Sequence, residues 1–366
     1  MKSGQPLSKY LEAPKRLLVM RLDRIGDVAL STPVLRAARK AWPQAFIAMM
    51  VRTACADVVA GHPDVNEVIL YDKEASHRSP LATIGFARSL RRYRFDTALV
   101  LHPSHRAHWI PWLAGIRRRI GYDRKQPWLL THRLAHRKQE GEKHEAEYAL
   151  DMLRPFGIEP AAPEPFIAID PDAKDRVARL LHLKSVPDDA KLVAIHPSAS
   201  CVSKRWMPER FAAVADKLAA HKDVRICVVA GKEDLQAAQA LELAMRQRLI
   251  NLAGQLSVGE LIALLKRCRL LISNDSGPVH LAAAVGTPVV DIFGRNQAGL
   301  SPRRWGPLGQ GHIILHKEVG CEVCLAHNCQ IQFKCLTELS VDEVYSAALG
   351  VLRLGPARFD TPEAPC

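Results

Sequence analysis

Gly26-Asp27, directly after the apolar run 16–21, is the first place where this chain of 366 residues presents a side chain suited to acid–base chemistry. Gly26 permits a close approach of the backbone to a ligand. The Asp27 carboxyl, with a reference pKa of about 4, is ionised at neutral pH and available as a general base. Spacing alone favours a helix-capping carboxylate over a catalytic one.

A second acidic turn, Asn274-Asp275-Ser276-Gly277, lies between an expected strand at 270–273 and a helix of small residues. A helix N-terminus offers free backbone N–H groups and the positive end of a dipole, which suits a phosphate. Asp275 is placed to accept ribose or sugar hydroxyls. Because Asp and Ser are also common helix caps, the turn by itself leaves both interpretations open.

Two further loops in the second half of the chain carry polar groups at strand ends. Residues 196–211 contain three serines and then Lys204, and hydroxyls with a lysine can hold a diphosphate. A surface loop with incidental charge is an equal alternative. In 230–236, Glu233 or Asp234 is placed to bond a ribose, but a lone glycine with an acid is a weak signal.

Four cysteines crowd into fifteen residues near the end of the chain: Cys321, Cys324, Cys329 and Cys335. Four thiols can enclose a structural Zn or Fe ion tetrahedrally. Only the first spacing matches common metal fingers, so free thiols or disulfides are together an equal alternative, and disulfides are disfavoured in a cytoplasm.

Strand-like apolar runs alternate with helical segments along the whole chain. This alternation is typical of parallel, doubly wound α/β sheets, whose ligands bind beyond the carboxyl ends of the strands. We therefore predict two Rossmann-like domains facing a central cleft. The expected strands are 16–21, 46–51, 65–72, 95–102 and 166–170 in the first half, and 191–199, 224–231, 249–254, 270–273, 288–293 and 312–317 in the second.

Five prolines between residues 157 and 190 indicate a connection between the two halves. The predicted organisation is an N-terminal domain at 1–170, a linker at 171–190, a C-terminal domain at 191–340, and a terminal helix with a tail at 341–366.

The net charge of +13 requires an acidic partner: nucleic acid, an anionic membrane or an anionic substrate. Residues 88–143 hold fourteen Lys or Arg against four acids, with tryptophans interleaved. Basic residues with aromatics suit single-stranded nucleic acid, but no nucleic-acid fold motif accompanies them. The N-terminus lacks a signal-peptide pattern and no apolar run has the length of a membrane span, so we expect a cytoplasmic protein.

Three segments together resemble the signatures of glycosyltransferase family 9, the ADP-heptose:lipopolysaccharide heptosyltransferases. They are RIGDVALSTPVLRAARKAWP (24–43), IHPSASCVSKRWMPERF (195–211) and NDSGPVHLAAAVGTPVVDIFG (274–294). Their order and spacing agree along nearly the whole chain, so the combination is more specific than any single motif. The resemblance implies the GT-B fold, with an acceptor-binding N-terminal domain and a nucleotide-sugar-binding C-terminal domain.

The resemblance also implies a reaction: inverting transfer of L-glycero-D-manno-heptose from ADP-heptose to a lipopolysaccharide inner-core acceptor. Asp27, beside Gly26 in the acceptor half, matches the family's proposed general base, and Lys204 matches the lysine that neutralises the departing diphosphate. The implied donor-binding residues are Ser198, Asp275, Ser276, Gly277, His280 and, with a less certain alignment, Glu233. Catalysis of this kind needs no metal cofactor, because Lys204 and the helix N-terminus supply positive charge.

The resemblance also suggests a partner for the basic residues in 88–143. We expect Arg117, Arg118 and Arg119 to bind the anionic lipopolysaccharide core and to hold the enzyme at the inner face of the inner membrane. One alternative keeps the fold with another nucleotide sugar or a non-lipopolysaccharide acceptor. Another is a non-catalytic, basic nucleic-acid-binding protein, although we expect no nucleic-acid partner.

Overall fold

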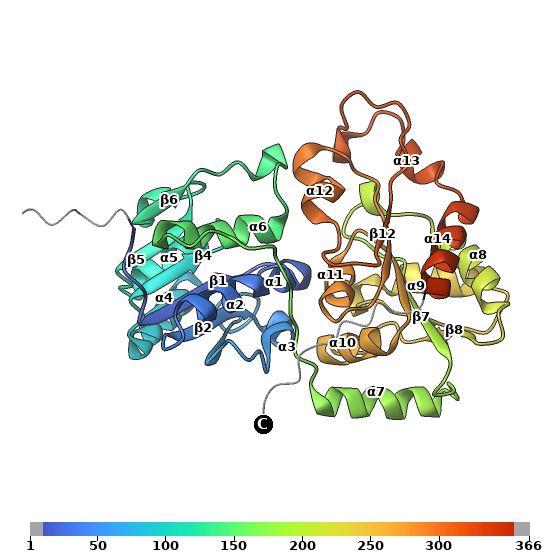
Figure 1. Cartoon of the computed structure of the whole chain (residues 1–366), viewed down its shortest axis with the longest axis horizontal. Coiled ribbons are helices and arrows are strands. Elements are labelled where there is room, and N and C mark those ends of the chain that lie inside the picture. The colour runs from blue at the N-terminus through green and yellow to red at the C-terminus, as the bar shows by residue number, and fades with distance from the viewer. Residues whose placement is uncertain (1–9, 355–366) are drawn as a thin grey trace, which may run out of the picture. The chain divides into compact units, whose positions relative to one another are not determined.

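The computed structural model describes residues 10–354, which divide into two compact units, each built around one parallel sheet (Figure 1). Within the described residues, unit 1 comprises 10–138 and Glu145–Pro163, and unit 2 comprises Gln139–His144 and 164–354. The segment expected as a linker contains a helix of unit 2, α7 (Pro171–Leu183), whose Arg176 donates to Glu260 of α10 (Val258–Arg267) at 2.9 Å. The tail predicted at 355–366 lies outside the described residues.

The sheet of unit 1 runs in the order β3-β2-β1-β4-β5-β6, with every neighbouring pair parallel. Its strands are β1 (Arg16–Arg21), β2 (Phe46–Arg52), β3 (Glu67–Tyr71), β4 (Thr97–Val100), β5 (Arg118–Tyr122) and β6 (His132–Leu134). Its helices are α1 (Ile25–Ala29), α2 (Thr32–Ala41), α3 (Ala56–Val59), α4 (Pro80–Ser89), α5 (His105–Leu113) and α6 (Glu145–Leu150).

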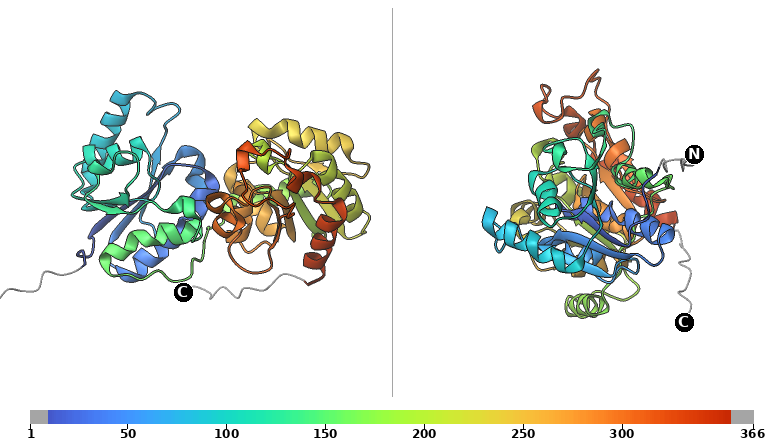
Figure 2. Two further views of the ribbon diagram at one scale, coloured as in Figure 1. Left: turned by 90° about the horizontal axis from the view of Figure 1, so that it is seen from above. Right: turned by 90° about the vertical axis from the view of Figure 1, so that its left-hand side faces the viewer.

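Burial on both faces explains why β1 reads as an uninterrupted apolar run. Leu18 and Met20 join the core formed with Ala87 of α4 and Ile110 of α5. Leu17 and Val19 alternate with them, point to the other face and are also completely buried. Helices lie on both sides of the sheet in Figure 2, as a parallel sheet requires.

Unit 2 repeats this architecture, with six parallel strands in the order β12-β11-β10-β7-β8-β9. The strands are β7 (Lys191–His196), β8 (Val224–Val228), β9 (Ile250–Asn251), β10 (Leu270–Asn274), β11 (Val289–Ile292) and β12 (Ile313–Leu315). The remaining helices are α8 (Pro208–Ala219), α9 (Leu235–Ala244), α11 (Gly277–Ala284), α12 (Pro302–Trp305), α13 (Lys334–Thr337) and α14 (Val341–Leu354). The fully buried Trp206 and Phe211 stack edge to face, 4.9 Å apart, in the core shared by β7, α8 and α14.

Each sheet reverses its strand order at one point. In unit 1 the reversal falls between the neighbours β1 and β4, and in unit 2 between β7 and β10. The loops that leave these strands run in opposite directions, which opens a crevice at the carboxyl edge where open α/β sheets bind ligands. The four loops after β1, β4, β7 and β10 are therefore the positions where function is expected.

The prediction of a strand at 166–170 is wrong, because that run forms no strand in the described structure and leads directly into α7. Unit 1 completes its sheet instead with β5 and β6, which the pattern did not reveal. Three of the five residues of β5 are apolar or glycine and two are arginines, so the segment reads as a charged surface.

Candidate active site

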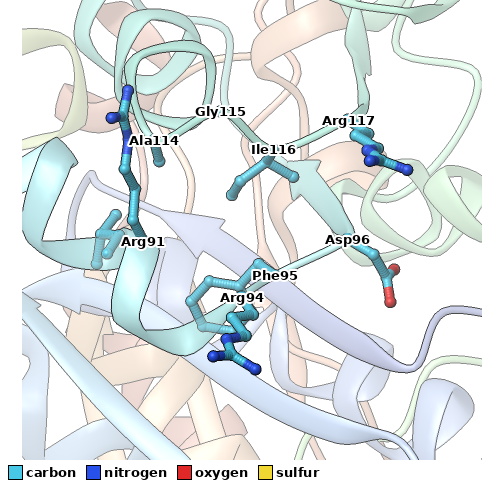
Figure 3. Close-up of a pocket in the computed structure, with 9 residues that line it drawn as sticks. Arg91, Arg94, Phe95, Asp96, Ala114, Gly115, Ile116 and Arg117 are labelled. Carbon is cyan, nitrogen blue, oxygen red and sulfur yellow. The ribbon is translucent and has the colours of Figure 1, made fainter.

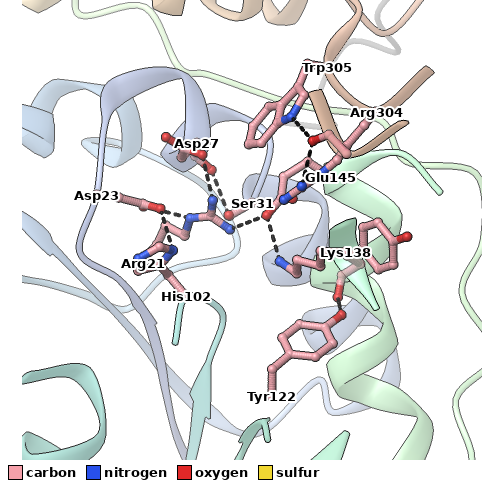
Figure 4. Close-up of polar contacts among 12 residues, drawn as sticks. Arg21, Asp23, Asp27, Ser31, His102, Tyr122, Lys138, Glu145, Arg304 and Trp305 are labelled. Atoms are coloured by element: carbon pink, nitrogen blue, oxygen red, sulfur yellow. Dashed lines mark hydrogen bonds and ion pairs between the residues drawn. The ribbon is translucent and has the colours of Figure 1, made fainter. Parts of the chain in front are cut away.

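Arg21 organises the carboxyl edge of unit 1. It is the last residue of β1, and its side chain is only 1% exposed. Its guanidinium donates through Nε to Asp23 at 2.7 Å, through Nη2 to Asp27 Oδ1 at 2.7 Å, and through Nη1 to Glu145 at 3.0 Å (Figure 4). A planar group with five N–H donors suits this task, because it holds three carboxylates in fixed directions.

Asp27 lies in the first turn of α1, with its side chain 17% exposed. Burial is the largest influence on its pKa and raises it, and the neighbouring Asp23 raises it further. The Arg21 charge acts in the opposite direction, but the balance still leaves the pKa above the usual range for Asp. Because Arg21 holds Oδ1, the second oxygen is available to accept a proton. Asp27 therefore has the environment of a general base.

Glu145, at the start of α6, is shared by two cations. Its Oε1 accepts from Arg21 at 3.0 Å and from Lys138 Nζ at 2.7 Å. The Lys138 Nζ also lies 4.6 Å from the centre of the Tyr122 ring. Glu145, Lys138 and Tyr122 are all buried. This pairing ties α6 to β1 and fixes the guanidinium that positions Asp27.

In unit 2, Lys204 and Asp275 meet at the reversal point. Lys204 follows β7 and Asp275 follows β10, and the Lys204 Nζ lies 2.9 Å from Asp275 Oδ2. Arg295, after β11, binds the same oxygen at 2.8 Å. All three side chains are mostly buried, with exposed fractions of 15%, 5% and 6%. Two cations on one carboxylate leave a net positive site, suited to an anion.

The turn at Ser276 is not an ordinary side-chain cap. Ser276 precedes α11, but its hydroxyl makes no capping hydrogen bond and lies instead 3.1 Å from His196 Nδ1. Burial lowers the pKa of His196 to about 4, so this imidazole is neutral. In the first turn of α11 the Gly277 backbone N–H has no side-chain acceptor among the described residues, Pro278 has no N–H, and the Val279 N–H donates to the Ser276 carbonyl at 3.2 Å. Gly277 therefore offers the one N–H of these three residues that a phosphate can bind.

Several buried polar atoms of unit 2 have no hydrogen-bond partner anywhere in residues 10–354. Among them are Ser198 Oγ, His280 Nδ1 and Arg295 Nε, and Ser198 and His280 lie on the loop after β7 and on α11. Burial lowers the pKa of His280 to about 3, so it is a neutral donor or acceptor. Buried polar groups normally find partners, so these atoms mark a place where a polar ligand belongs.

Asp291, on β11, is completely buried, and both of its carboxyl oxygens are also without a partner among the described residues. Burial raises its pKa well above the ordinary range, and the nearby Asp275 raises it further. Asp291 is therefore a buried carboxyl with a raised pKa close to Asp275 and Lys204, a feature that the sequence pattern did not reveal.

Glu233, predicted to bind the donor, does not contact the Lys204–Asp275 pair in the described structure. It is exposed after β8, at the same edge of the sheet as Lys204 and one strand away.

The three arginines predicted to bind the acceptor, Arg117, Arg118 and Arg119, lie at the amino end of β5, at the edge of the sheet opposite Asp27. Arg118 pairs with Asp96 at 2.9 Å, and Arg119 donates to the backbone of Leu129 at 2.6 Å. Among the three, only Arg117 is exposed, whereas Arg118 and Arg119 are partly buried, and Arg117 lines a cavity of about 350 Å³ with Arg91 and Arg94 (Figure 3).

The four clustered cysteines are free thiols. Cys324 accepts from the Asn296 backbone N–H at 3.3 Å, and Cys335 donates to the Gly294 carbonyl at 3.0 Å. In residues 10–354, no group of three or more His, Cys, Asp or Glu side chains is arranged to hold a metal ion. The thiols as placed do not fit a metal, and a structural Zn or Fe stays a prediction of the sequence alone.

Comparison with known proteins decides the family. Residues 84–334 match the family model described as glycosyltransferase family 9 (heptosyltransferase). The chain belongs to glycosyltransferase family 9. The lipopolysaccharide core heptosyltransferase OpsX of Haemophilus influenzae is 25% identical over 289 residues, which cover 78% of this chain and 80% of that protein.

Two solved structures carry the same fold as this family 9 protein. A family 9 glycosyl transferase from Veillonella parvula superposes with a TM-score of 0.86 at 26% identity, over 94% of this chain and 99% of that one. The ADP-heptose lipopolysaccharide heptosyltransferase II of E. coli gives a TM-score of 0.78 at 22% identity, over 93% and 99%. Two six-stranded parallel sheets with flanking helices are the GT-B fold of these enzymes, as the sequence predicted. Within residues 10–354, none of the helices combines the length and apolar composition needed to cross a bilayer.

Proposed function

We propose that this family 9 glycosyltransferase moves L-glycero-D-manno-heptose from ADP-heptose to a lipopolysaccharide inner-core acceptor, with inversion at the anomeric carbon. The observation that carries the proposal is the positive site at the reversal point of unit 2, where Lys204 and Arg295 share the Asp275 carboxylate. Family membership and the names of the relatives, which include lipopolysaccharide core heptosyltransferases, support the choice of sugar.

Asp27 is the proposed general base. Its free oxygen takes the proton of an acceptor hydroxyl as that hydroxyl oxygen bonds to the anomeric carbon of heptose. The bond from that carbon to the diphosphate oxygen breaks at the same time, and its electron pair leaves with ADP. A positioned base contributes about 10²–10⁴-fold in rate, and a raised pKa brings its strength closer to that needed at neutral pH.

The leaving diphosphate is the proposed ligand of Lys204, Arg295 and the Gly277 N–H at the start of α11. Charge develops on the diphosphate as the bond breaks, so cations and N–H donors fixed beforehand lower the barrier. Ser198, His280 and Ser276 are proposed to bind the donor through the polar groups described above, and Glu233 to bond the ribose. Asp275 holds both cations in place before the donor arrives.

The basic surface of unit 1 is proposed to contact anionic lipid rather than the reacting sugar, because Arg117 lies at the sheet edge opposite Asp27. Arg91 and Arg94 join Arg117 around the cavity in Figure 3, and all three are exposed. Juxtamembrane cations of this kind are attracted to the anionic inner leaflet. Replacing all three with Gln should release the protein from anionic vesicles in a sedimentation assay, and unchanged binding would count against the contact.

Turnover of ADP-heptose with a panel of truncated core acceptors tests the proposed function. We expect release of ADP with one acceptor of the panel, and loss of that turnover in Asp27→Asn with the fold intact by circular dichroism. Calorimetry with ADP-, UDP- and GDP-sugars tests the donor in the same protein. A preference for UDP or GDP, or full activity in Asp27→Asn, would overturn the proposal.

A further inference from the structure

His102 lies two residues beyond β4, in the second loop that flanks the reversal point of unit 1. β1 and β4 are parallel neighbours, with Met20 paired to Val100, so the loops that carry Asp27 and His102 leave the sheet side by side. Ligands of open α/β sheets bind between such loops. The resemblance to family 9 assigned no role to His102, and no apolar or acidic pattern in the sequence singled it out.

Asp23 connects this histidine to the proposed base. One carboxylate oxygen of Asp23 accepts from Arg21 Nε at 2.7 Å, and the other lies 3.1 Å from His102 Nδ1. The same guanidinium binds Asp27 through Nη2 (Figure 4). A chain of four groups, His102, Asp23, Arg21 and Asp27, therefore has fixed mutual positions along the crevice.

The contact with Asp23 determines which nitrogen of His102 carries the proton. An ionised carboxylate only accepts hydrogen bonds, so Nδ1 is the donor and Nε2 has a bare lone pair. Burial lowers the pKa of His102 to about 4, and the Arg21 charge adds to this effect, so the ring is neutral at neutral pH. The side chain is nevertheless 43% exposed, and Nε2 points away from Asp23 across the ring.

We propose that His102 is an acceptor-binding residue, whose Nε2 accepts a hydrogen bond from a sugar hydroxyl close to the hydroxyl that Asp27 deprotonates. Asp23 is the positioning residue, because it fixes the orientation and the tautomer of the imidazole. This inference rests on the proposed function, since it supplies the substrate class that the site recognises. The free Asp27 oxygen and His102 Nε2 then accept from two different hydroxyls of one sugar.

Steady-state kinetics with ADP-heptose and the preferred core acceptor test the inference. His102→Ala should raise the acceptor KM about 10-fold, as expected for the loss of one hydrogen bond to a positioned group. The donor KM should stay the same and kcat should change less than about 3-fold. His102→Gln, which retains an acceptor atom, should recover part of the loss.

Two comparisons separate this role from a structural one. Asp23→Asn should raise the acceptor KM in the same direction and should also lower kcat, because Asp23 accepts from Arg21 as well as from His102. In the double variant with His102→Ala, the rise in acceptor KM should be less than the product of the two single effects, since both changes remove the same hydrogen bond. His105→Ala, an exposed histidine three residues further along, is the matched control and should behave as the wild type. An unchanged acceptor KM in His102→Ala, or an equal loss in His105→Ala, would overturn the inference while the proposed function stands.

A binding measurement decides the inference without turnover. In protein labelled with ¹⁵N-histidine, the Nδ1 signal of His102 should be that of a protonated nitrogen at neutral pH. The Nε2 signal should shift when a de-acylated, water-soluble inner-core oligosaccharide is added. Absence of that shift would overturn the inference, whereas failure of the wild type to turn over ADP-heptose would overturn the proposed function.

Discussion

Arg21 Nη2 lies 2.7 Å from Asp27 Oδ1, and the same guanidinium holds Asp23 and Glu145. One buried cation thus neutralises part of a cluster of three carboxylates, and Lys138 neutralises another part through Glu145. The base of the proposed reaction is therefore held by a structural ion cluster and does not stand alone on a loop. Stability and catalysis are coupled at this position.

Arg21→Gln should reduce the free energy of unfolding by about 3–5 kcal/mol, because it leaves buried carboxylates without a cation. Chemical denaturation monitored by circular dichroism measures this difference. Lys191→Gln is the control, since its pair with Asp223 is on the surface, where the two side chains are 45% and 56% exposed. That change should cost less than about 1 kcal/mol. Equal losses in the two variants would contradict a special role for Arg21.

The pH dependence of kcat/KM should show an acid limb above the ordinary Asp range, because Asp27 works only when ionised and its pKa is raised. Asp27→Glu should keep an acid limb with a lower rate, and Asp27→Asn should remove the activity. A limb at the ordinary pKa of 3.8 would show that Asp27 is not buried as described.

The same raised pKa predicts how stability depends on pH. Between 3.8 and the raised value, the folded protein binds a proton at Asp27 that the unfolded chain has lost. The contribution of Asp27 to stability is therefore fully present below 3.8 and is lost as the pH rises through the raised pKa. Asp27→Asn should remove this part of the pH dependence, which unfolding curves at several pH values can measure.

Lys204→Ala should lower kcat by about 10²–10³-fold, as expected when a charge that stabilises the transition state is removed. ADP should also bind more weakly in calorimetry, since Arg295 alone remains beside Asp275. Lys222→Ala is the matched control, because Lys222 is exposed and precedes β8 at the opposite edge of the same sheet. A similar loss in both variants would indicate a general effect of charge.

Gly294, two residues after the end of β11, should not tolerate a side chain. A Cβ there would lie 2.4 Å from the Ser203 carbonyl oxygen and 2.8 Å from Leu336. Gly294→Ala should therefore displace the loop that carries Lys204 and weaken ADP binding, which calorimetry measures. In α14, a Cβ at Gly350 would meet nothing within 4 Å, so Gly350→Ala should leave binding unchanged and stabilise the helix by about 0.5–1 kcal/mol.

The sequence identified the turns that follow the central strands, because local chemistry is enough to recognise them. Apolar runs marked β1, β7 and β10, and each was followed by a polar turn with Asp27, Lys204 or Asp275. It did not reveal β5, where Arg118 and Arg119 look like a charged surface. In the structure Arg118 pairs with Asp96 and Arg119 donates to the Leu129 carbonyl. These partners satisfy the two charged side chains, which allows a basic segment to form a strand.

The sequence by itself determined the family, the doubly wound class of each half and the identity of the proposed base and lysine. Only the tertiary structure decided the surroundings of these residues. Glu145 lies 124 positions from Arg21, and His196 lies 80 positions from Ser276. Partners so distant in sequence meet because parallel strands bring their carboxyl ends to one edge, and no local pattern encodes which of them will be neighbours. Burial at that edge then raises the pKa of Asp27 and Asp291 and lowers the pKa of His102, shifts that residue type alone does not determine.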